Sequence, residues 1–83
     1  MADRERLPLY GRAECHLCEE MATQLKSLAK DLGIEVLDVD IDSDPVLANQ
    51  YNDLVPVLIH GDREVARYHL NIEALRAYLA EIR

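Results

Sequence analysis

Residues 9–21 read Leu9-Tyr10-Gly11-Arg12-Ala13-Glu14-Cys15-His16-Leu17-Cys18-Glu19-Glu20-Met21 and carry both cysteines of the chain. The apolar run from Leu7 to Tyr10 ends at Gly11, which indicates a short strand. Beyond the cysteines, apolar side chains recur with the period of one helix face, at Met21, Leu25, Leu28 and Leu32. The sequence therefore predicts a strand, then the two cysteines, then an amphipathic helix.

Cys15 and Cys18 occupy a position that favours thiol chemistry, Cys15 near the N-cap of the predicted helix and Cys18 in its first turn. A thiolate rather than a thiol attacks a disulfide, and the unpaired N–H groups at a helix start stabilise a thiolate. We therefore expect Cys15 to be the nucleophile. Cys18, one turn along, is expected to be more buried and to act as the resolving thiol that releases the product.

The next elements form a βαβ unit. Gly33 stands where a helix commonly ends, and residues 34–41 are rich in β-branched side chains, which indicates a second strand. The connection between the two strands holds a helix, so the strands are predicted to be parallel.

The remainder of the chain predicts a short helix, a hairpin and a last helix. Asp44-Pro45 resembles an N-cap followed by proline at the first helical position, and Asn71 is a plausible N-cap for the last helix. Between them, the apolar runs 55–59 and 65–68 flank a turn at Gly61-Asp62. The order is βαβαββα, an α/β fold in a single domain over residues 1–83, with residues 1–6 expected to be a flexible N-terminus.

Composition narrows the possible partners and the compartment. The chain has 83 residues, 49% hydrophobic, and a formal net charge of −7, with 16 acidic against 9 basic side chains. Nucleic acid and anionic membranes attract clustered Lys and Arg, so neither is an expected partner. No apolar signal-peptide core follows the charged start, and two closely spaced cysteines are consistent with a reducing compartment. We expect a monomer in the cytoplasm.

The cysteine pair has two alternative interpretations besides redox chemistry. It could be half of a zinc or iron–sulfur site, or a pair of inert buried thiols. His60 and His69 are nine residues apart, and the sequence holds no second Cys-x-x-Cys. The ligand count is therefore too low for a metal site, and no metal ligand is assigned. A binding module that carries metal or docks a partner without turnover remains the alternative function.

The quoted stretch, with Val55-Pro56-Val57 about forty residues on, resembles the thioredoxin superfamily and specifically its small glutaredoxin-like branch. The match covers nearly the whole chain. The resemblance implies a four-stranded mixed sheet flanked by helices and a cis bond between Val55 and Pro56 opposite the cysteines, although proline at a strand start is the alternative. It also implies a thiol–disulfide oxidoreductase acting in electron transport and cell redox homeostasis. Such an enzyme would need no bound cofactor and could use glutathione as reductant.

Four residues around the cysteines are candidates for substrate binding. Val55 would offer its backbone to a substrate peptide or glutathione, with Pro56 beside the sulfurs. Arg12 could guide an anionic partner such as a glutathione carboxylate, and His16 could tune the thiolate, although each could also be an exposed side chain. The expected partner is a disulfide-containing protein or glutathione.

Alternating acids follow the second strand, at Asp38, Asp40, Asp42 and Asp44. Without a glycine-bearing loop and a bidentate Glu, they do not resemble a calcium loop. We interpret them as a solvated acidic sheet edge, which discourages edge-to-edge aggregation.

Overall fold

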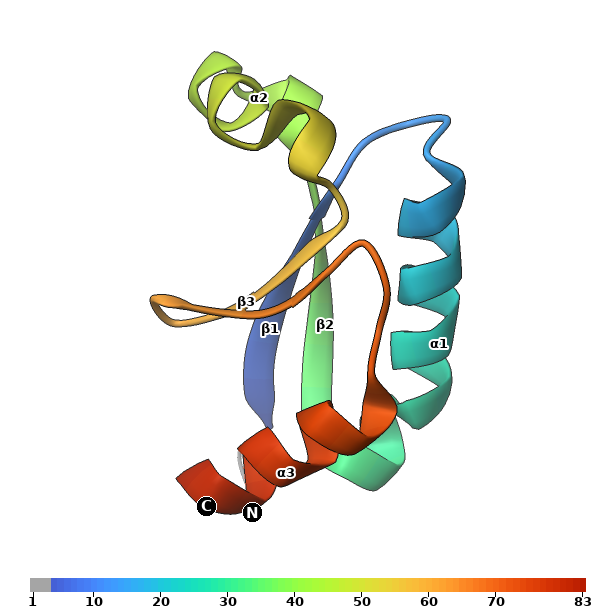
Figure 1. The fold of residues 1–83 in the computed structure, drawn as a ribbon, viewed down its shortest axis with the longest axis vertical. Coiled ribbons are helices and arrows are strands. Elements are labelled where there is room, and N and C mark those ends of the chain that lie inside the picture. The colour runs from blue at the N-terminus through green and yellow to red at the C-terminus, as the bar shows by residue number, and fades with distance from the viewer. Residues whose placement is uncertain (1–3) are drawn as a thin grey trace.

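The computed structural model describes residues 4–83, in which three helices and two short 3₁₀ turns accompany one four-stranded sheet (Figure 1). The strands are β1 Glu5–Gly11, β2 Ile34–Asp40, β3 Val57–His60 and β4 Arg63–Arg67. The helices are α1 His16–Leu32, α2 Pro45–Tyr51 and α3 Ile72–Ile82, with 3₁₀ turns η1 Ile41–Ser43 and η2 Asn52–Leu54. The order βαβαββα is confirmed.

The sheet is mixed and has the strand order β2-β1-β3-β4. β1 runs parallel to β2 and antiparallel to β3, which in turn pairs antiparallel with β4. The predicted βαβ unit is therefore present, and β1 lies in the interior of the sheet. Gly11, the last residue of β1, pairs with Asp40, the last residue of β2, so both strands deliver the chain to the same end of the sheet.

Capping residues fix where the helices begin and end, as the sequence predicted. Asp44 accepts a hydrogen bond from the Val46 N–H at 2.9 Å ahead of α2, and Asn71 accepts one from the Ala74 N–H at 3.0 Å ahead of α3. Gly33 ends α1 in the left-handed conformation, with φ of 69°. That conformation is costly for a residue with a Cβ, which explains glycine at this position.

The N-terminal strand starts earlier than predicted, because β1 begins at Glu5 rather than Leu7. The Glu5 N–H donates to the Gly33 carbonyl at 3.3 Å, and the Glu5 carboxylate pairs with Arg83 at 2.8 Å. The flexible segment expected over residues 1–6 therefore does not include Glu5 and Arg6, a correction that comes from pairing with distant residues. Residues 1–3 of that expectation lie outside the described residues.

The other strand boundaries shift for local reasons. β2 ends at Asp40, one residue early, because the Asp40 side chain accepts from the Asp42 N–H at 2.9 Å and starts η1. β3 begins at Val57 rather than Val55, since Pro56 has no N–H for a sheet hydrogen bond. β4 spans Arg63–Arg67 and stops before Tyr68, whose φ of 65° leaves the extended region.

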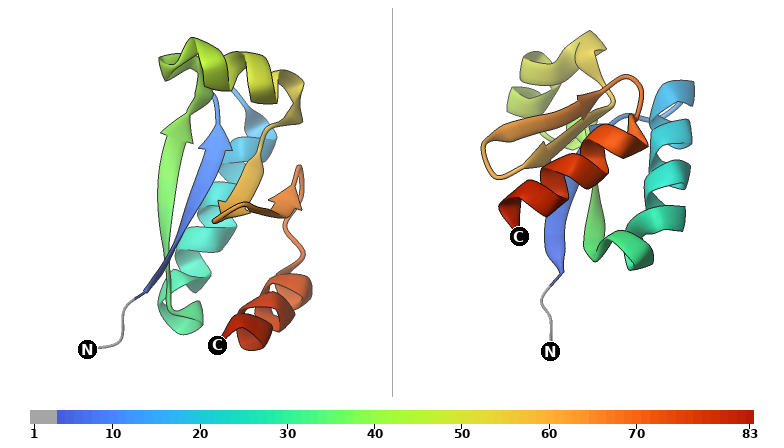
Figure 2. Two further views of the ribbon diagram at one scale, coloured as in Figure 1. Left: turned by 90° about the vertical axis from the view of Figure 1, so that its left-hand side faces the viewer. Right: turned by 60° about the horizontal axis from the view of Figure 1, so that its bottom comes forward.

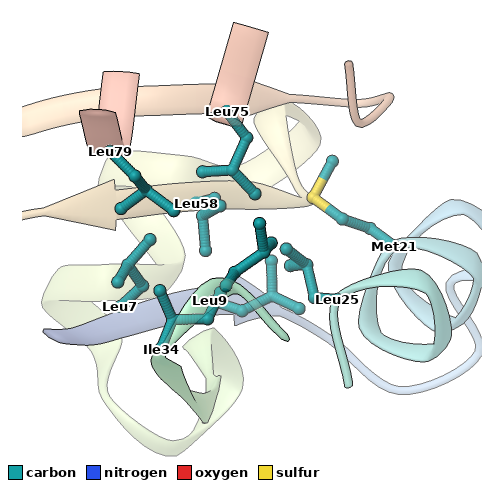
Figure 3. Close-up of a cluster of buried hydrophobic side chains, with 9 residues drawn as sticks. Leu7, Leu9, Met21, Leu25, Ile34, Leu58, Leu75 and Leu79 are labelled. Carbon is teal, nitrogen blue, oxygen red and sulfur yellow. The ribbon is translucent and has the colours of Figure 1, made fainter. Parts of the chain in front are cut away.

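One face of the sheet carries the main core, covered by α1 and α3 (Figure 3). Its buried members come from both helices and three strands: Leu7, Leu9, Met21, Leu25, Leu32, Ile34, Leu58, Leu75 and Leu79. All are 4% exposed or less, so their burial supplies the main apolar contribution to stability. The helical spacing seen in the sequence is the core-facing stripe of α1.

α2 lies at the end of the sheet where β1 and β2 finish, away from α3 and the last turn of α1 (Figures 1 and 2). η1 leads into α2, and η2 returns the chain to β3. Within the described residues, no helix is long and apolar enough to cross a membrane.

The variant Leu25→Ala should lower the free energy of unfolding by about 2–5 kcal/mol, because it leaves a cavity among fully buried side chains. Val46→Ala is the control, since Val46 is 70% exposed on α2 and its truncation should change stability by at most about 0.5 kcal/mol. Urea unfolding followed by circular dichroism measures both. Equal losses in the two variants would contradict the placement of Leu25 in the core.

Candidate functional site

The cysteine pair lies at the start of α1, where Cys15 is the N-cap and Cys18 sits in the first turn. The two sulfurs form a disulfide with Cα atoms 5.2 Å apart. The Cys18 N–H donates to the Cys15 sulfur at 3.1 Å, so the cap of the helix is itself the expected nucleophile. A thiolate at this position would accept the same hydrogen bond more strongly, because charge strengthens it.

The two cysteine residues differ in exposure in the way the sequence predicted. Cys15 is partly exposed, whereas Cys18 is 8% exposed and packs with Ile41 and Val55. Gly11 makes this burial possible, since a Cβ there would lie 3.3 Å from both the Cβ and the sulfur of Cys18. A glycine at the end of β1 therefore lets Cys18 pack closely against the sheet.

The segment before β3 contributes Val55 and Pro56 to this end of the sheet. The Val55–Pro56 peptide bond is cis, as the resemblance implied. Val55 is 7% exposed and belongs to the same apolar cluster as Cys18, which brings the segment and the cysteines together. The Pro56 carbonyl accepts from the Tyr68 N–H at 2.9 Å, so the loop after β4 is anchored to this segment.

A stacked tyrosine pair supports the cluster from the α2 side. The rings of Tyr10 and Tyr51 lie 4.7 Å apart between centroids, with an interplanar angle of 16°. Both pack against the cluster that contains Cys18 and Val55. Burial raises the pKa of Tyr51, with smaller contributions from Tyr10 and Glu64. The stack joins β1 to α2 and so holds the end of the sheet together.

Arg12 is engaged within the protein. Its guanidinium donates to the two carboxylate oxygens of Asp42 at 2.7 and 3.3 Å and to the Asn52 carbonyl at 3.3 Å. The hydrogen bond to Asp42 raises the pKa of Arg12 and lowers that of Asp42. Arg12 thus ties the loop before Cys15 to η1 and to the end of α2, and its expected role in binding an anionic partner stays a prediction.

His16 points away from the cluster into solvent, since its side chain is 83% exposed. It lies 3.1 Å from the Glu20 carboxylate, one turn along the helix. The structure therefore does not bring His16 together with Cys18 and Val55, and tuning of the thiolate by His16 stays a prediction.

Three non-glycine residues of the described part have positive φ, and all lie in loops at this end of the molecule. They are Glu14 at 59°, Asn52 at 30° and Tyr68 at 65°. Glu14 directly precedes Cys15, Asn52 accepts from Arg12, and the Tyr68 N–H is bound to Pro56. Such backbone conformations are unfavourable and gather at functional sites, where surrounding contacts maintain them.

Sequence reasoning missed the Tyr10–Tyr51 stack and the pairing of Arg12 with Asp42. Asp42 belonged to a series of four similar aspartates, and no local pattern distinguishes the one that meets an arginine thirty residues away in sequence. Tyr10 and Tyr51 are far apart in sequence, and no local pattern predicts that their rings stack. Among residues 4–83, no three His, Cys, Asp or Glu side chains are grouped closely enough to hold a metal ion.

A βαβαββα chain with a Cys-x-x-Cys pair at the start of α1 and a cis proline directly before β3 defines a protein of the thioredoxin superfamily. The model of the family described as Glutaredoxin-like domain (DUF836) matches residues 6–80. The chain belongs to this glutaredoxin-like family.

Relatives and solved structures agree with that assignment. An uncharacterized protein of Mycobacterium tuberculosis is 30% identical over 82 residues, which cover 93% of this chain and 84% of the relative. A protein of Nitrosomonas europaea solved by NMR is 39% identical with a TM-score of 0.80, covering 94% of each chain. Thioredoxin 1 of Thermosipho africanus, at 22% identity and a TM-score of 0.65 over 93% of this chain and 97% of its own, is similar in fold.

The Arg12–Asp42 pair should make stability fall on acidification. Because the pair lowers the pKa of Asp42 in the folded state, it stabilises the fold above the ordinary aspartate pKa of about 3.9, and this contribution is lost as the pH falls below that value. Urea unfolding at neutral pH and near pH 3 should therefore show a smaller acid-induced loss for Asp42→Asn than for the wild type.

Asp62→Asn provides the matched control, since Asp62 is exposed in the β3–β4 turn and makes none of the described ion pairs. Its acid-induced loss should equal that of the wild type. If Asp42→Asn also loses as much stability as the wild type on acidification, the pair does not contribute to the fold.

Proposed function

We propose that this protein is a thiol–disulfide oxidoreductase in which Cys15 is the nucleophile and Cys18 the resolving thiol. The observation that carries the proposal is the asymmetry of the pair: a partly exposed Cys15 at a helix N-cap, bonded to a Cys18 that is 8% exposed. An attacking thiol has to reach its substrate, and a resolving thiol has to reach only its neighbour.

The first step starts from the dithiol form. The Cys15 thiolate attacks one sulfur of the substrate disulfide, the substrate S–S bond breaks, and a mixed disulfide forms between Cys15 and the substrate. The other substrate sulfur leaves as a thiolate and takes a proton from solvent. The Cys18 N–H, 3.1 Å from the Cys15 sulfur, would stabilise the attacking thiolate before this step.

The second step is intramolecular. Cys18 loses its proton and attacks the Cys15 sulfur, the mixed disulfide breaks, and the second substrate sulfur leaves as a thiol after protonation. The protein dithiol has lost two electrons to the substrate and is now the Cys15–Cys18 disulfide. A thiol reductant, of which glutathione is one, restores the dithiol by the same exchange in reverse.

The substrate would bind beside the cysteine pair along Val55 and Pro56. Val55 lies outside the paired residues of β3, so its backbone groups are not used in the sheet ladder and could pair with an extended substrate segment. The proposed partners are disulfide-containing proteins or glutathione mixed disulfides. A reducing compartment such as the cytoplasm would supply the thiols that reduce the Cys15–Cys18 disulfide back to the dithiol.

Single cysteine variants test the assignment of roles. With bis(2-hydroxyethyl) disulfide as a neutral substrate, Cys18→Ser should accumulate one hydroxyethylthio adduct on Cys15, because the mixed disulfide can no longer be resolved. In Cys15→Ser, an adduct should form on Cys18 much more slowly than it forms on Cys15 in Cys18→Ser, since Cys18 is buried. Intact-mass spectrometry after acid quenching measures both, and circular dichroism confirms that the fold is retained.

Adduct formation at Cys18 in Cys15→Ser, as fast as at Cys15 in Cys18→Ser, would contradict the proposed roles. Absence of adduct in both variants, together with stoichiometric metal in freshly purified wild-type protein, would favour the binding-module alternative.

A further inference from the structure

Carboxylates surround the cysteine pair at its end of the sheet. Glu14 precedes Cys15, Glu19 and Glu20 follow Cys18, and a series of aspartates continues from the end of β2 to η2. The exposed acids of this rim are Glu14, Glu19, Glu20, Asp40, Asp42, Asp44 and Asp53. Asp42 is bound to Arg12 and raises its pKa, and the charges of Asp53 and Asp40 raise the pKa of Arg12 further.

Three basic side chains on this side of the molecule are already beside carboxylates. Arg12 is bound to Asp42, His16 lies beside Glu20, and Lys26 pairs with Asp38. Glu14, Glu19 and Asp53 make none of the ion pairs described for residues 4–83. The rim therefore carries negative charge that this chain does not neutralise.

The cations without a described ion-pair partner lie elsewhere. They are Arg4 ahead of β1, Lys30 in the last turn of α1, Arg63 at the start of β4 and Arg76 in α3. None of the four lies in the segments that carry the rim, which run from Glu14 to Glu20 and from Asp40 to Asp53. The net charge of −7 is thus unevenly distributed, with the cysteine pair on the acidic side.

A hollow of about 310 Å³ beside Cys18 continues this acidic surface. Glu19, Asp38 and Asp40 line it together with Arg12 and Lys26, which are paired with Asp42 and Asp38, and with apolar side chains. The apolar lining members are Leu9, Ala22 and Val39. Because both bases already have a carboxylate partner, while Glu19 and Asp40 make none of the ion pairs described for residues 4–83, the hollow suits a side chain with an aliphatic stem and a cationic head, as Lys and Arg have.

We propose that the site selects disulfides flanked by cationic side chains and discriminates against anionic disulfides, an inference that rests on the proposed function. A field of one sign around a reactive group raises the encounter rate with opposite charge and lowers it with like charge. Each glutathione carries two carboxylates and one ammonium group, so glutathione disulfide is an anion and belongs to the disfavoured class. The favoured substrate is a basic peptide segment of a disulfide-containing protein.

The test is a single-turnover comparison of three peptide disulfides. Each is the disulfide-linked dimer of a blocked pentapeptide with Cys at its centre and Lys, Gln or Glu at both flanking positions. Pre-reduced protein is mixed with each dimer without further reductant, so the protein dithiol is oxidised while each dimer gives two peptide thiols. The rate of protein oxidation is measured by acid quenching, alkylation and intact-mass spectrometry. Each rate is divided by the rate at which dithiothreitol reduces the same dimer, and the quotient is the corrected rate.

At low ionic strength the corrected rate for the Lys peptide should exceed that for the Glu peptide by about tenfold or more, with the Gln peptide between them. In about 0.5 M sodium chloride the ratio should approach one, because salt screens exposed charges. The double variant Glu14→Gln/Glu19→Gln should lower the low-salt ratio by about threefold or more. The ratio is independent of the nucleophilicity of Cys15, which cancels within one variant.

The matched control Asp31→Asn/Glu81→Gln removes the same charge from exposed positions at the far ends of α1 and α3 and should leave the ratio close to that of the wild type. Oxidation of the protein by all three peptides at equal corrected rates would overturn the inference and leave the proposed function standing. If both double variants lower the ratio equally, the inference is also overturned, because the carboxylates of the rim would then matter no more than distant ones. No oxidation by any peptide would overturn the proposed function itself.

Discussion

The hydrogen bond from the Cys18 N–H to the Cys15 sulfur, at 3.1 Å, joins the start of α1 to the chemistry of the site. It satisfies one of the N–H groups that a helix start leaves unpaired, and it places that donor on the sulfur that would carry negative charge. The helix in turn is held by its buried stripe, in which Met21 and Leu25 are 1% exposed or less. Packing of the core therefore fixes the direction of α1, and α1 fixes both cysteines.

The end of the sheet is assembled from contacts between segments that are distant in sequence. Gly11 leaves room for Cys18, Tyr10 stacks on Tyr51, and Arg12 bridges to η1 and to Asn52. Three consecutive residues at the end of β1 thus reach three different parts of the site. This arrangement explains why the loops around the cysteines can keep positive φ at non-glycine residues such as Glu14, since neighbouring contacts hold them in place.

Local signals made most of the fold predictable from the sequence, because each acts within a few residues. The Asp44-Pro45 and Asn71 caps, the left-handed Gly33 and the apolar stripe of α1 were all read correctly. The early start of β1 at Glu5 depends on Gly33 and Arg83, and no local pattern contains that information. The cis bond at Pro56 came from the family resemblance alone, since most X–Pro bonds are trans.

In the candidate site, too, local features were predictable from the sequence and contacts between distant residues were not. The position and unequal burial of the cysteines follow from their place at a helix start, whereas the pairing of Arg12 with Asp42 required the fold. The acidic series illustrates the limit: Asp38 and Asp40 do lie on the edge strand β2, as interpreted, but Asp42 lies in η1 and Asp44 caps α2. A charge pattern in the sequence predicted exposure but not which acids would gather around the disulfide.

Reversible dithiol–disulfide exchange at Cys15 and Cys18 is tested most directly by measuring the redox equilibrium of the pair. Intact-mass spectrometry after alkylation, on protein equilibrated in graded buffers of reduced and oxidised glutathione, gives the fraction of disulfide at each potential. Equilibration of protein that starts reduced and protein that starts oxidised should give the same curve, so that slow reaction with glutathione does not distort it. We expect a two-electron transition between dithiol and disulfide at about −270 to −200 mV, the range spanned by thioredoxin and the glutaredoxins. A pair that stays fully reduced, or fully oxidised, across that range would contradict reversible dithiol–disulfide exchange.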